Sequence, residues 1–186
     1  MTIRKISEIN WKRVRPNRGG VIPYKIVEGK FFFCLGVDTK SQDLTDFGGG
    51  IWGGESVIEG CLREFMEESL LAFGEFKVEN GHNIYNRFSA FGEYRLIGDC
   101  HVIYNRSTMI IFLPVKCDME TTSRIFNQRV STYYNPEVKS IRWIESDHFL
   151  PAIRNASSKW GDVELKLYSR VAKLLAPTGE FWKSFH

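Results

Sequence analysis

One segment constrains the fold of this 186-residue chain more than any other, because it joins a glycine-rich turn to a helical pattern. It runs from Gly49 to Leu71 and reads GGIWGGESVIEGCLREFMEESLL. From Glu55 onward its apolar residues recur at steps of three and four, which is the spacing of a helix with one buried face. We therefore predict a helix from Glu55 to about Leu71 that follows a tight turn and packs its apolar face against the core.

Three glutamates lie together on one flank of this predicted helix. Glu64, Glu67 and Glu68 have the i, i+3, i+4 spacing that places side chains on one side. Like charges at this spacing weaken a helix by about 0.2–0.5 kcal/mol per pair, and a divalent cation with oxygen ligands would offset the repulsion. From this pattern alone, a solvated acidic face is an equal alternative. Gly60, one turn before Glu64, leads to the hypothesis that a metal-bound phosphate approaches the helix there.

The remaining sequence predicts further strands and helices. Two apolar runs, VIPYKIV and KFFFCLGV, flank Glu28-Gly29 and indicate a β-hairpin between Gly19 and Asp38. A short strand over 44–50 leads into the glycine-rich turn. Other strands are expected over 91–97, 109–116 and 138–145, and helices over 121–130 and 162–176, the last with Asp162 as N-cap and Pro177 as stop. Because strands and helices mix without regular alternation, we predict an α+β fold with one domain over residues 1–186.

Cysteine spacing and the N-terminal residues bear on the compartment. Four cysteines are spread without a CxxC pair, which predicts reduced, buried thiols in a cytosol-like compartment. The first residues are charged and lack the apolar core of a secretory signal, and no apolar run approaches the roughly 20 residues of a membrane span. We therefore expect a cytoplasmic protein without a membrane partner. The net charge of +3 is slight, but a basic stretch near the start attracts phosphate-rich ligands or is a solvated arm: Lys12, Arg13, Arg15 and Arg18.

The segment from Gly49 to Leu71 resembles the signature of the Nudix hydrolases, G-x5-E-x7-R-E-U-x-E-E-x-G-U, where U is a bulky apolar residue. Gly49 is followed after five residues by Glu55, and after seven more by Arg63-Glu64. The apolar and acidic positions that complete the match are Phe65, Glu67, Glu68 and Leu71. One position departs, because Leu70 stands where the family has glycine. Glycine there permits a left-handed helix cap, which leucine resists, so we expect this helix to run on toward Gly74.

The resemblance implies the Nudix fold, a mixed sheet between helices, and hydrolysis of a diphosphate linkage in a nucleotide derivative. It also implies Mg²⁺ or Mn²⁺ as cofactor. By position, Glu67 and Glu68 would be metal ligands, and Glu64 would be a ligand or the catalytic base. Gly49 would supply a metal-facing carbonyl or the tight turn.

Other catalytic positions follow from the same resemblance. Glu55 and Arg63 would form a supporting ion pair that orients the other glutamates. Many family members use a further glutamate outside the signature, and Glu137, which precedes a predicted strand, is the candidate here. A surface position is an equal interpretation of Glu137, and Glu120 and Glu93 are weaker candidates for the same role.

Substrate-binding candidates lie near the predicted metal site. Trp52 lies inside the glycine-rich loop, where it is available to stack on a base, whereas Phe47 is expected to be buried. Arg18 and Lys25 flank the first strand and are candidates to face phosphates. The triplet Asp46-Phe47-Gly48 matches a kinase motif, but the other kinase segments are missing from the chain, so we take the match as incidental.

Several substrates remain open from the sequence. A nucleotide or nucleotide derivative is the default substrate. Capped RNA is an alternative supported by the basic N-terminal stretch, Trp52 and a likeness to Nudix proteins of large DNA viruses. Diphosphoinositol polyphosphates are a third class, since some of their hydrolases carry GGG at this point. A Nudix-fold binding module without catalysis is a hypothesis of another class, and Leu70 is its only support. The sequence does not predict the oligomeric state.

Overall fold

The predicted hairpin forms the centre of the main sheet in the computed structural model, which describes residues 3–149, 157–160 and 163–175. Strands β2 (Arg18–Val27) and β3 (Lys30–Asp38) pair antiparallel. Glu28 and Gly29 both have positive φ, 51° and 77°, as a two-residue hairpin turn of this twist requires. The turn chemistry therefore sets the register of the two longest strands.

Eight strands form this main sheet, in the order β1-β9-β10-β2-β3-β11, with β4 beside β3 and β5 beside β2. Only the β10–β2 pair is parallel among the described pairings of this sheet, so the sheet is mixed. The bounds of the other six strands are β1 (Ile3–Lys5), β4 (Leu44–Thr45), β5 (Phe47–Gly50), β9 (His101–Tyr104), β10 (Thr108–Pro114) and β11 (Val138–Glu145).

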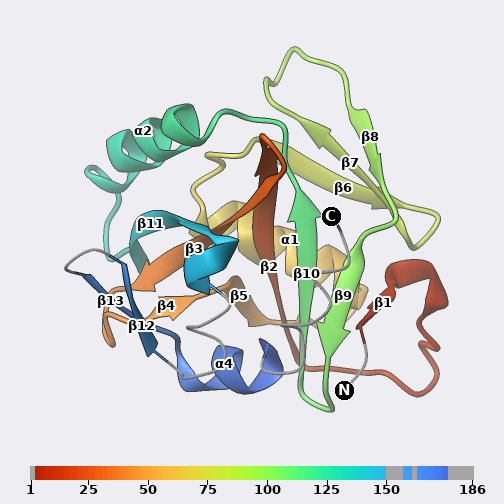
Figure 1. Ribbon diagram of the computed structural model, residues 1–186. Coiled ribbons are helices and arrows are strands. Elements are labelled where there is room, and N and C mark those ends of the chain that lie inside the picture. Colours follow the sequence, from red (N-terminus) through yellow and green to blue (C-terminus); the bar gives the residue numbers. More distant parts are fainter. Residues whose placement is uncertain (1–2, 150–156, 161–162, 176–186) are drawn as a thin grey trace.

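Alternating side chains of the sheet fill two separate cores. On β2, Val21 belongs to the core beneath helix α1 (Val57–Glu68), while its neighbour Ile22 belongs to the core beneath helix α4 (Ser169–Leu175). In Figure 1, α1 lies behind the sheet and α4 lies in front of its lower edge. Helix α2 (Met119–Val130) adds Phe126 to the α1 side. The structure thus confirms the α+β class and the sheet between helices.

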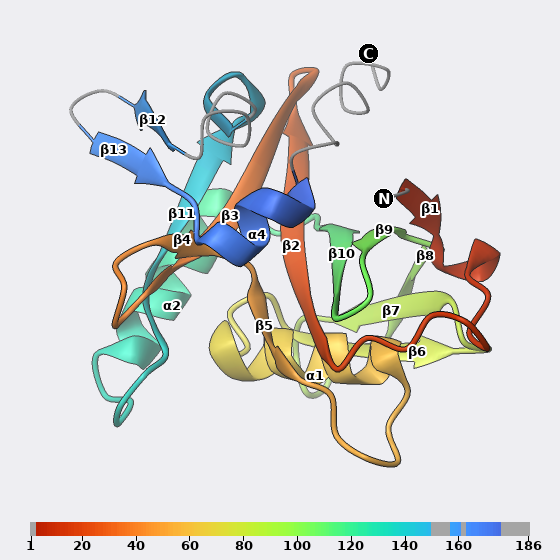
Figure 2. The same ribbon diagram turned by 90° about the horizontal axis from the view of Figure 1, so that it is seen from below.

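A smaller three-stranded sheet lies beside α1, as Figure 2 shows. Its strands are β6 (Glu75–Glu79), β7 (Asn83–Arg87) and β8 (Arg95–Gly98). The prediction of a strand over 91–97 was wrong at its start, because residues 91–94 are not in a strand and β8 begins only at Arg95. The prediction also missed β6 and β7, which are short and carry polar residues that obscure the alternation of a strand.

The C-terminal helix differs most from its prediction over 162–176. Val163–Lys166 is strand β13, paired antiparallel with β12 (Ser157–Trp160), and α4 begins only at Ser169. A short apolar run fits either period, and here the hydrogen bonds to β12 decide the outcome. Asp162, Pro177 and the terminal GEFWKSFH lie outside the described residues.

Helix α1 begins at a side-chain cap and ends earlier than predicted. The backbone N–H of Glu59 donates to Ser56 Oγ at 3.1 Å, which is an N-cap interaction. The helix ends at Glu68 rather than running on to Gly74, so that prediction was wrong. Leu70 and Leu71 both adopt left-handed φ, 54° and 58°. The physical reason lies in the contacts of this turn.

The turn after α1 is a Schellman cap with leucine in the usual glycine position. The N–H of Leu70 donates to the Glu67 carbonyl, 3.2 Å, and that of Leu71 donates to the Met66 carbonyl, 3.0 Å. Arg129 of α2 donates through Nη1 to the Leu70 carbonyl at 2.7 Å. These bonds, with packing of Leu70 against the α1-side core, offset the left-handed strain.

The four cysteines are free thiols, and Cys34, Cys61 and Cys100 are buried. Burial raises the pKa of Cys34 and Cys61 well above the ordinary value, so both are held as neutral thiols in the core. Among the helices that the structure describes, none is long and apolar enough to cross a bilayer.

Candidate active site

The glycine-rich strand β5 lies directly against the acidic flank of α1. A Cβ atom added to Gly49 would come within 2.6 Å of the Glu64 carboxylate, so this approach requires glycine. The N–H of Gly48 donates to Glu68 Oε2 at 2.7 Å. Pairing of β5 with β2, Gly19 opposite Gly49, holds this backbone in place. The strand therefore positions two of the three signature glutamates.

Arg63 organises the loop between β5 and α1. Its guanidinium binds Glu55 through two bonds, Nε to Oε2 at 3.0 Å and Nη2 to Oε1 at 2.8 Å, and Nη2 also donates to the Gly50 carbonyl at 2.8 Å. The Glu55 interaction raises the pKa of Arg63 and lowers that of Glu55. The guanidinium also stacks on the Trp52 ring, 3.5 Å from its centroid. The loop is thus tied to the helix at several points.

The same guanidinium reaches two glutamates of the acidic flank. Arg63 Nη1 is 2.9 Å from Glu64 Oε1 and 3.4 Å from Glu67 Oε2. Burial raises the pKa of Glu64 against the opposing effect of Arg63, and the charges of Glu67 and Glu137 raise it further. Glu64 is therefore a more basic carboxylate than a solvent-exposed one.

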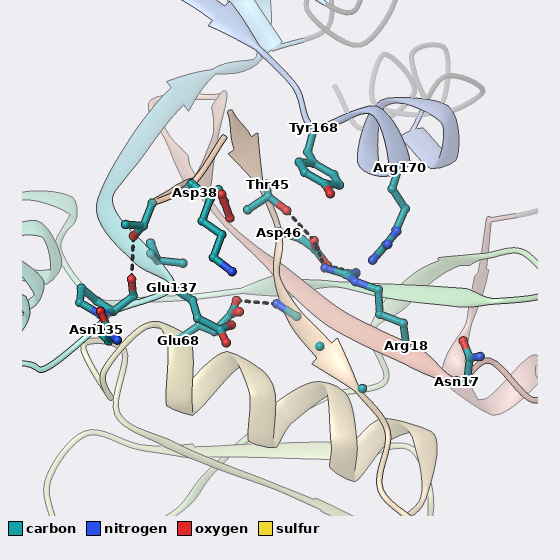
Figure 3. Close-up of a pocket in the computed structure, with 17 residues that line it drawn as sticks. Asn17, Arg18, Asp38, Thr45, Asp46, Glu68, Asn135, Glu137, Tyr168 and Arg170 are labelled. Atoms are coloured by element: carbon teal, nitrogen blue, oxygen red, sulfur yellow. Dashed lines mark hydrogen bonds and ion pairs between the residues drawn. The ribbon is translucent and has the colours of Figure 1, made fainter. Parts of the chain in front are cut away.

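Glu68 and Glu137 form a carboxyl pair from distant parts of the chain. Glu137 lies in the loop between α2 and β11, and in Figure 3 the two side chains lie close together. Burial, followed by the hydrogen bond to Glu137, raises the pKa of Glu68 to about 10. At neutral pH the pair accordingly holds a proton on Glu68, in the manner of two carboxyls that share one site.

A divalent cation fits the chemistry of this donor set. No three His, Cys, Asp or Glu side chains of the described residues gather about one point, and Arg63 bonds Glu64 at 2.9 Å. The donors nearby are nevertheless hard oxygen atoms, which Mg²⁺ and Mn²⁺ prefer. A cation in place of the Glu68 proton would offset the free-energy cost of desolvating that carboxylate in its charged form. The residues that could hold it are Glu64, Glu67, Glu68, Glu137 and the Gly49 carbonyl.

Two hollows open on either side of the Glu68–Glu137 pair. The larger has a volume of about 740 Å³ and reaches from Arg18 and β5 to Tyr168 and Arg170 (Figure 3). The smaller has a volume of about 300 Å³ and is bordered by Trp52, Arg63 and two tyrosines, Tyr133 and Tyr134. Glu68 and residues 135–138 line both hollows. The carboxyl pair therefore lies between two spaces of ligand size.

The structure separates the two cations proposed to face phosphates. Arg18 lines the larger hollow, but its guanidinium forms two bonds with the fully buried carboxylate of Asp46, 2.9 and 2.7 Å. The prediction that Lys25 faces phosphates was wrong, because Lys25 borders neither hollow. Its Nζ donates to the Lys116 carbonyl at 2.9 Å. Seven residues of strand separate it from Arg18, roughly 23 Å.

The structure also gives the positions of the remaining candidates from the sequence. Trp52 borders the smaller hollow with 60% of its surface exposed, while Phe47 is fully buried as predicted. The phosphate hypothesis for Gly60 was wrong, since an added Cβ there would meet Ile51 Cδ1 at 2.5 Å and Glu55 Oε1 at 2.8 Å. Gly60 therefore makes room for the loop itself. The weaker candidates Glu93 and Glu120 are exposed and border neither hollow.

Asp46 is a site residue that sequence reasoning missed. It was set aside as part of an incidental kinase-like triplet, yet its carboxylate is fully buried beside Arg18 and bonded to Thr45 Oγ1 at 3.1 Å. Its charge also raises the pKa of Glu68. A Cβ at Gly48 would approach Asp46 Oδ2 to 2.7 Å, so the glycines after the aspartate were the available signal. No comparable sequence signal marked Tyr168 and Arg170, which the fold brings here.

The chain is similar in structure to several Nudix hydrolases. A C. elegans Ap4A hydrolase binary complex aligns over 90% of this chain and 97% of its own, with 16% identity and a TM-score of 0.44. A Nudix hydrolase from M. smegmatis aligns over 92% and 88%, with 9% identity and a TM-score of 0.49. A Nudix-family hydrolase from Clostridium perfringens aligns over 91% and 99%, with 13% identity and a TM-score of 0.43. No protein-family model and no curated protein matches the sequence.

Proposed function

We propose that this protein is a Nudix hydrolase that uses Mg²⁺ or Mn²⁺ to cleave a diphosphate linkage in a nucleotide derivative. The observation that carries the proposal is the hydrogen-bonded Glu68–Glu137 pair beside Glu64, bordering a hollow of about 740 Å³. Placing two carboxyls in contact is unfavourable without a compensating charge, and Glu68 also loses hydration because it is partly buried. A cation site that binds phosphates accounts for that arrangement.

The carboxylates have different tasks in this mechanism. Glu67, Glu68 and Glu137 would hold the cation, which would supply positive charge to the diphosphate and a lowered pKa for the attacking water. Glu64 Oε2 would accept the proton of the attacking water, because Arg63 Nη1 bonds Oε1 and leaves Oε2 available among the hydrogen bonds of the described residues. The raised pKa of Glu64 brings its basicity closer to neutral pH, which favours proton transfer.

Arg63 and Glu55 are positioning residues in the proposal. Arg63 contacts Glu64 directly, and the two bonds to Glu55 fix the plane of its guanidinium. Glu55 also accepts the N–H of Trp52 at 2.7 Å, so it ties the loop to the helix. Gly49 completes the arrangement by allowing the backbone to approach Glu64.

A nucleotide or nucleotide derivative is the favoured substrate class. The larger hollow has cations and an aromatic ring opposite the carboxylates, and the smaller has exposed aromatic rings. Capped RNA is retained as the second candidate because Trp52, Tyr133 and Tyr134, with 60%, 55% and 89% of their surfaces exposed, border the smaller hollow, where a cap base would stack.

The hypothesis of a Nudix-fold binding module without catalysis depended on Leu70 alone. That residue adopts the left-handed conformation of the glycine it replaces, so the turn after α1 keeps its course. The departure from the signature therefore has no consequence for the carboxylates of the helix, all of which are present.

The direct test is a hydrolysis assay with millimolar Mg²⁺, and Mn²⁺ in parallel, on nucleotides, dinucleotides, nucleotide sugars, diphosphoinositol polyphosphates and capped RNA. Release of a nucleoside monophosphate, or of methylated GDP from capped RNA, would support the proposal and identify the substrate. Glu67→Gln and Glu68→Gln should abolish release while the far-UV spectrum stays unchanged. Glu59→Gln, an exposed glutamate in the first turn of α1, is the matched control. No release by the folded wild-type protein with either metal would reject the proposal.

A further inference from the structure

The far wall of the larger hollow is built by a segment after β13. Leu167 forms a parallel bridge with Leu44, and the N–H of Tyr168 donates to the Leu44 carbonyl at 2.8 Å. Leu167 and Val171 are buried in the α4-side core, while Tyr168 and Arg170 border the hollow. The core therefore fixes the wall that these two side chains form.

The charges of this hollow are divided between its two walls. On the α1 side lie Glu68 and Glu137. On the opposite side lies Arg170, which forms no ion pair with a carboxylate among the side chains that the structure describes. Lys40 also borders the hollow, but its turn is tied to the Glu137 wall, because the Thr39 N–H donates to the Glu137 carbonyl at 2.9 Å. The far wall thus has positive charge available to a ligand.

Two arginines point toward one another across this space. Figure 3 shows Arg170 extending from α4 toward Arg18, whose charge is already matched by Asp46. Asp46 matches the charge of Arg18 alone, so the charge of Arg170 remains unmatched at this place and would attract an anion. Phosphate is the anion whose geometry suits guanidinium groups best.

An aromatic face lies on the same wall. The Tyr168 ring packs partly on the α4-side core and also borders the hollow, and the Arg170 guanidinium carbon is 5.9 Å from its centroid. Because one side of the Tyr168 ring packs on the core, little conformational entropy is lost when a planar group stacks on its other side. The ring and the cations together match a base attached to a phosphate.

We infer that Tyr168 and Arg170 form a specificity subsite for a nucleoside monophosphate unit of the substrate, with the base on Tyr168 and the phosphate at Arg170. The inference rests on the proposed function for the reaction at the carboxylates. It places the nucleoside monophosphate unit of the substrate in the larger hollow. The group on the other side of the diphosphate linkage would then lie in the smaller hollow.

The test measures AMP binding to the full chain by calorimetry, without metal, so that it is independent of hydrolysis. Arg170→Gln should weaken AMP about tenfold through loss of a charged hydrogen bond. Tyr168→Ala should weaken it about tenfold through loss of stacking, and Tyr168→Phe should retain wild-type affinity. Lys173→Gln is the matched control, since Lys173 is exposed on the same helix and does not border the hollow.

Two simpler probes separate the parts of the subsite. Adenosine should lose affinity in Tyr168→Ala only, and inorganic phosphate in Arg170→Gln only. Failure of AMP to bind the wild-type protein at millimolar concentration would overturn the inference, as would equal binding by Arg170→Gln and Lys173→Gln. Arg170 is exposed, so this pair of variants decides the outcome even where Tyr168→Ala unfolds.

The hydrolysis assay distinguishes this inference from the proposed function. Residue-dependent AMP binding without hydrolysis of any substrate would reject the reaction and keep the nucleotide subsite. Hydrolysis with the KM of Arg170→Gln equal to that of Lys173→Gln would keep the reaction and reject the subsite. A raised KM with unchanged kcat in Arg170→Gln supports both.

Discussion

At the scale of single residues, the site depends on glycines that allow carboxylates to approach the backbone. Gly49 and Gly50 are neighbours in β5, yet only Gly49 faces a glutamate. An added Cβ meets Glu64 at Gly49 and nothing within 4 Å at Gly50. The two positions therefore provide a test in which the chemical change is identical and the environment differs.

We expect Gly49→Ala to lower kcat/KM by about 100-fold, because displacing a catalytic carboxylate by around 1 Å has effects of that size. Gly50→Ala should stay within about threefold of wild type, as a surface substitution without a contact does. Both are measured with the best substrate of the hydrolysis panel, and folding is checked by thermal melting. Equal activities of the two variants would contradict the assignment of Glu64 to the reaction.

Glu68 predicts a pH dependence of stability in the absence of metal. Folding raises its pKa from the ordinary value of about 4.3 to about 10, so the folded state binds the proton more tightly than the unfolded state. Its contribution to stability is thus fully present below about pH 4 and is lost as the pH rises toward 10. Glu68→Gln keeps a neutral side chain throughout and should remove this part of the slope.

The measurement is the melting temperature with a chelator present between pH 5 and 9. Wild type and Glu68→Gln should melt at similar temperatures at pH 5, and the variant should melt higher at pH 9. Parallel curves for the two proteins across this range would show that Glu68 does not carry the proton.

At the scale of elements, the end of α1 shows how tertiary contacts override local preference. Two consecutive leucines take left-handed φ, each at a cost of roughly 1–2 kcal/mol. Hydrogen bonds of the Schellman cap and the Arg129 bond from α2 hold the turn. A residue that is free of this strain should therefore stabilise the element.

Leu71→Gly should raise the free energy of unfolding by about 1 kcal/mol, since Leu71 is 44% exposed and glycine has no left-handed penalty. For a chain of this length that corresponds to about 2–4 °C in Tm. Leu71→Ala keeps the strain and removes the same packing, so it serves as the reference. A glycine variant no more stable than the alanine variant would indicate that this turn is unstrained.

At the scale of the whole molecule, a cation should couple the parts of the site to the stability of the fold. Its proposed ligands come from α1 and from the loop before β11, and the site adjoins β5. A ligand that binds only the folded state stabilises it by about 2.7 kcal/mol at 100 times its Kd. The cation would also offset the cost of desolvating the Glu68 carboxylate.

We therefore expect saturating Mg²⁺ or Mn²⁺ to raise the Tm of the wild-type protein by several degrees, and chelation to reverse the change. Glu67→Gln and Glu68→Gln should lose most of this increase, whereas Glu59→Gln should retain it. Differential scanning fluorimetry with and without metal gives the comparison. The same increase in all four proteins would place the cation elsewhere.

Local patterns in the sequence were enough to predict the hairpin at Glu28-Gly29, the helix with its acidic flank and the strand over 138–145. Each depends on residues a few positions apart, so turn chemistry and periodicity carry the information. The approach of Gly49 to Glu64 also follows from one short segment, which is why a signature in the sequence marks it.

Only the tertiary structure decided which distant groups meet. It pairs Glu68 with Glu137, neutralises Arg18 with Asp46 and removes Lys25 from the site. It also bends Leu70 into a conformation that its own preference opposes. Such outcomes depend on burial and on hydrogen bonds between elements, whose free energies exceed local propensities and have no periodic trace along the chain.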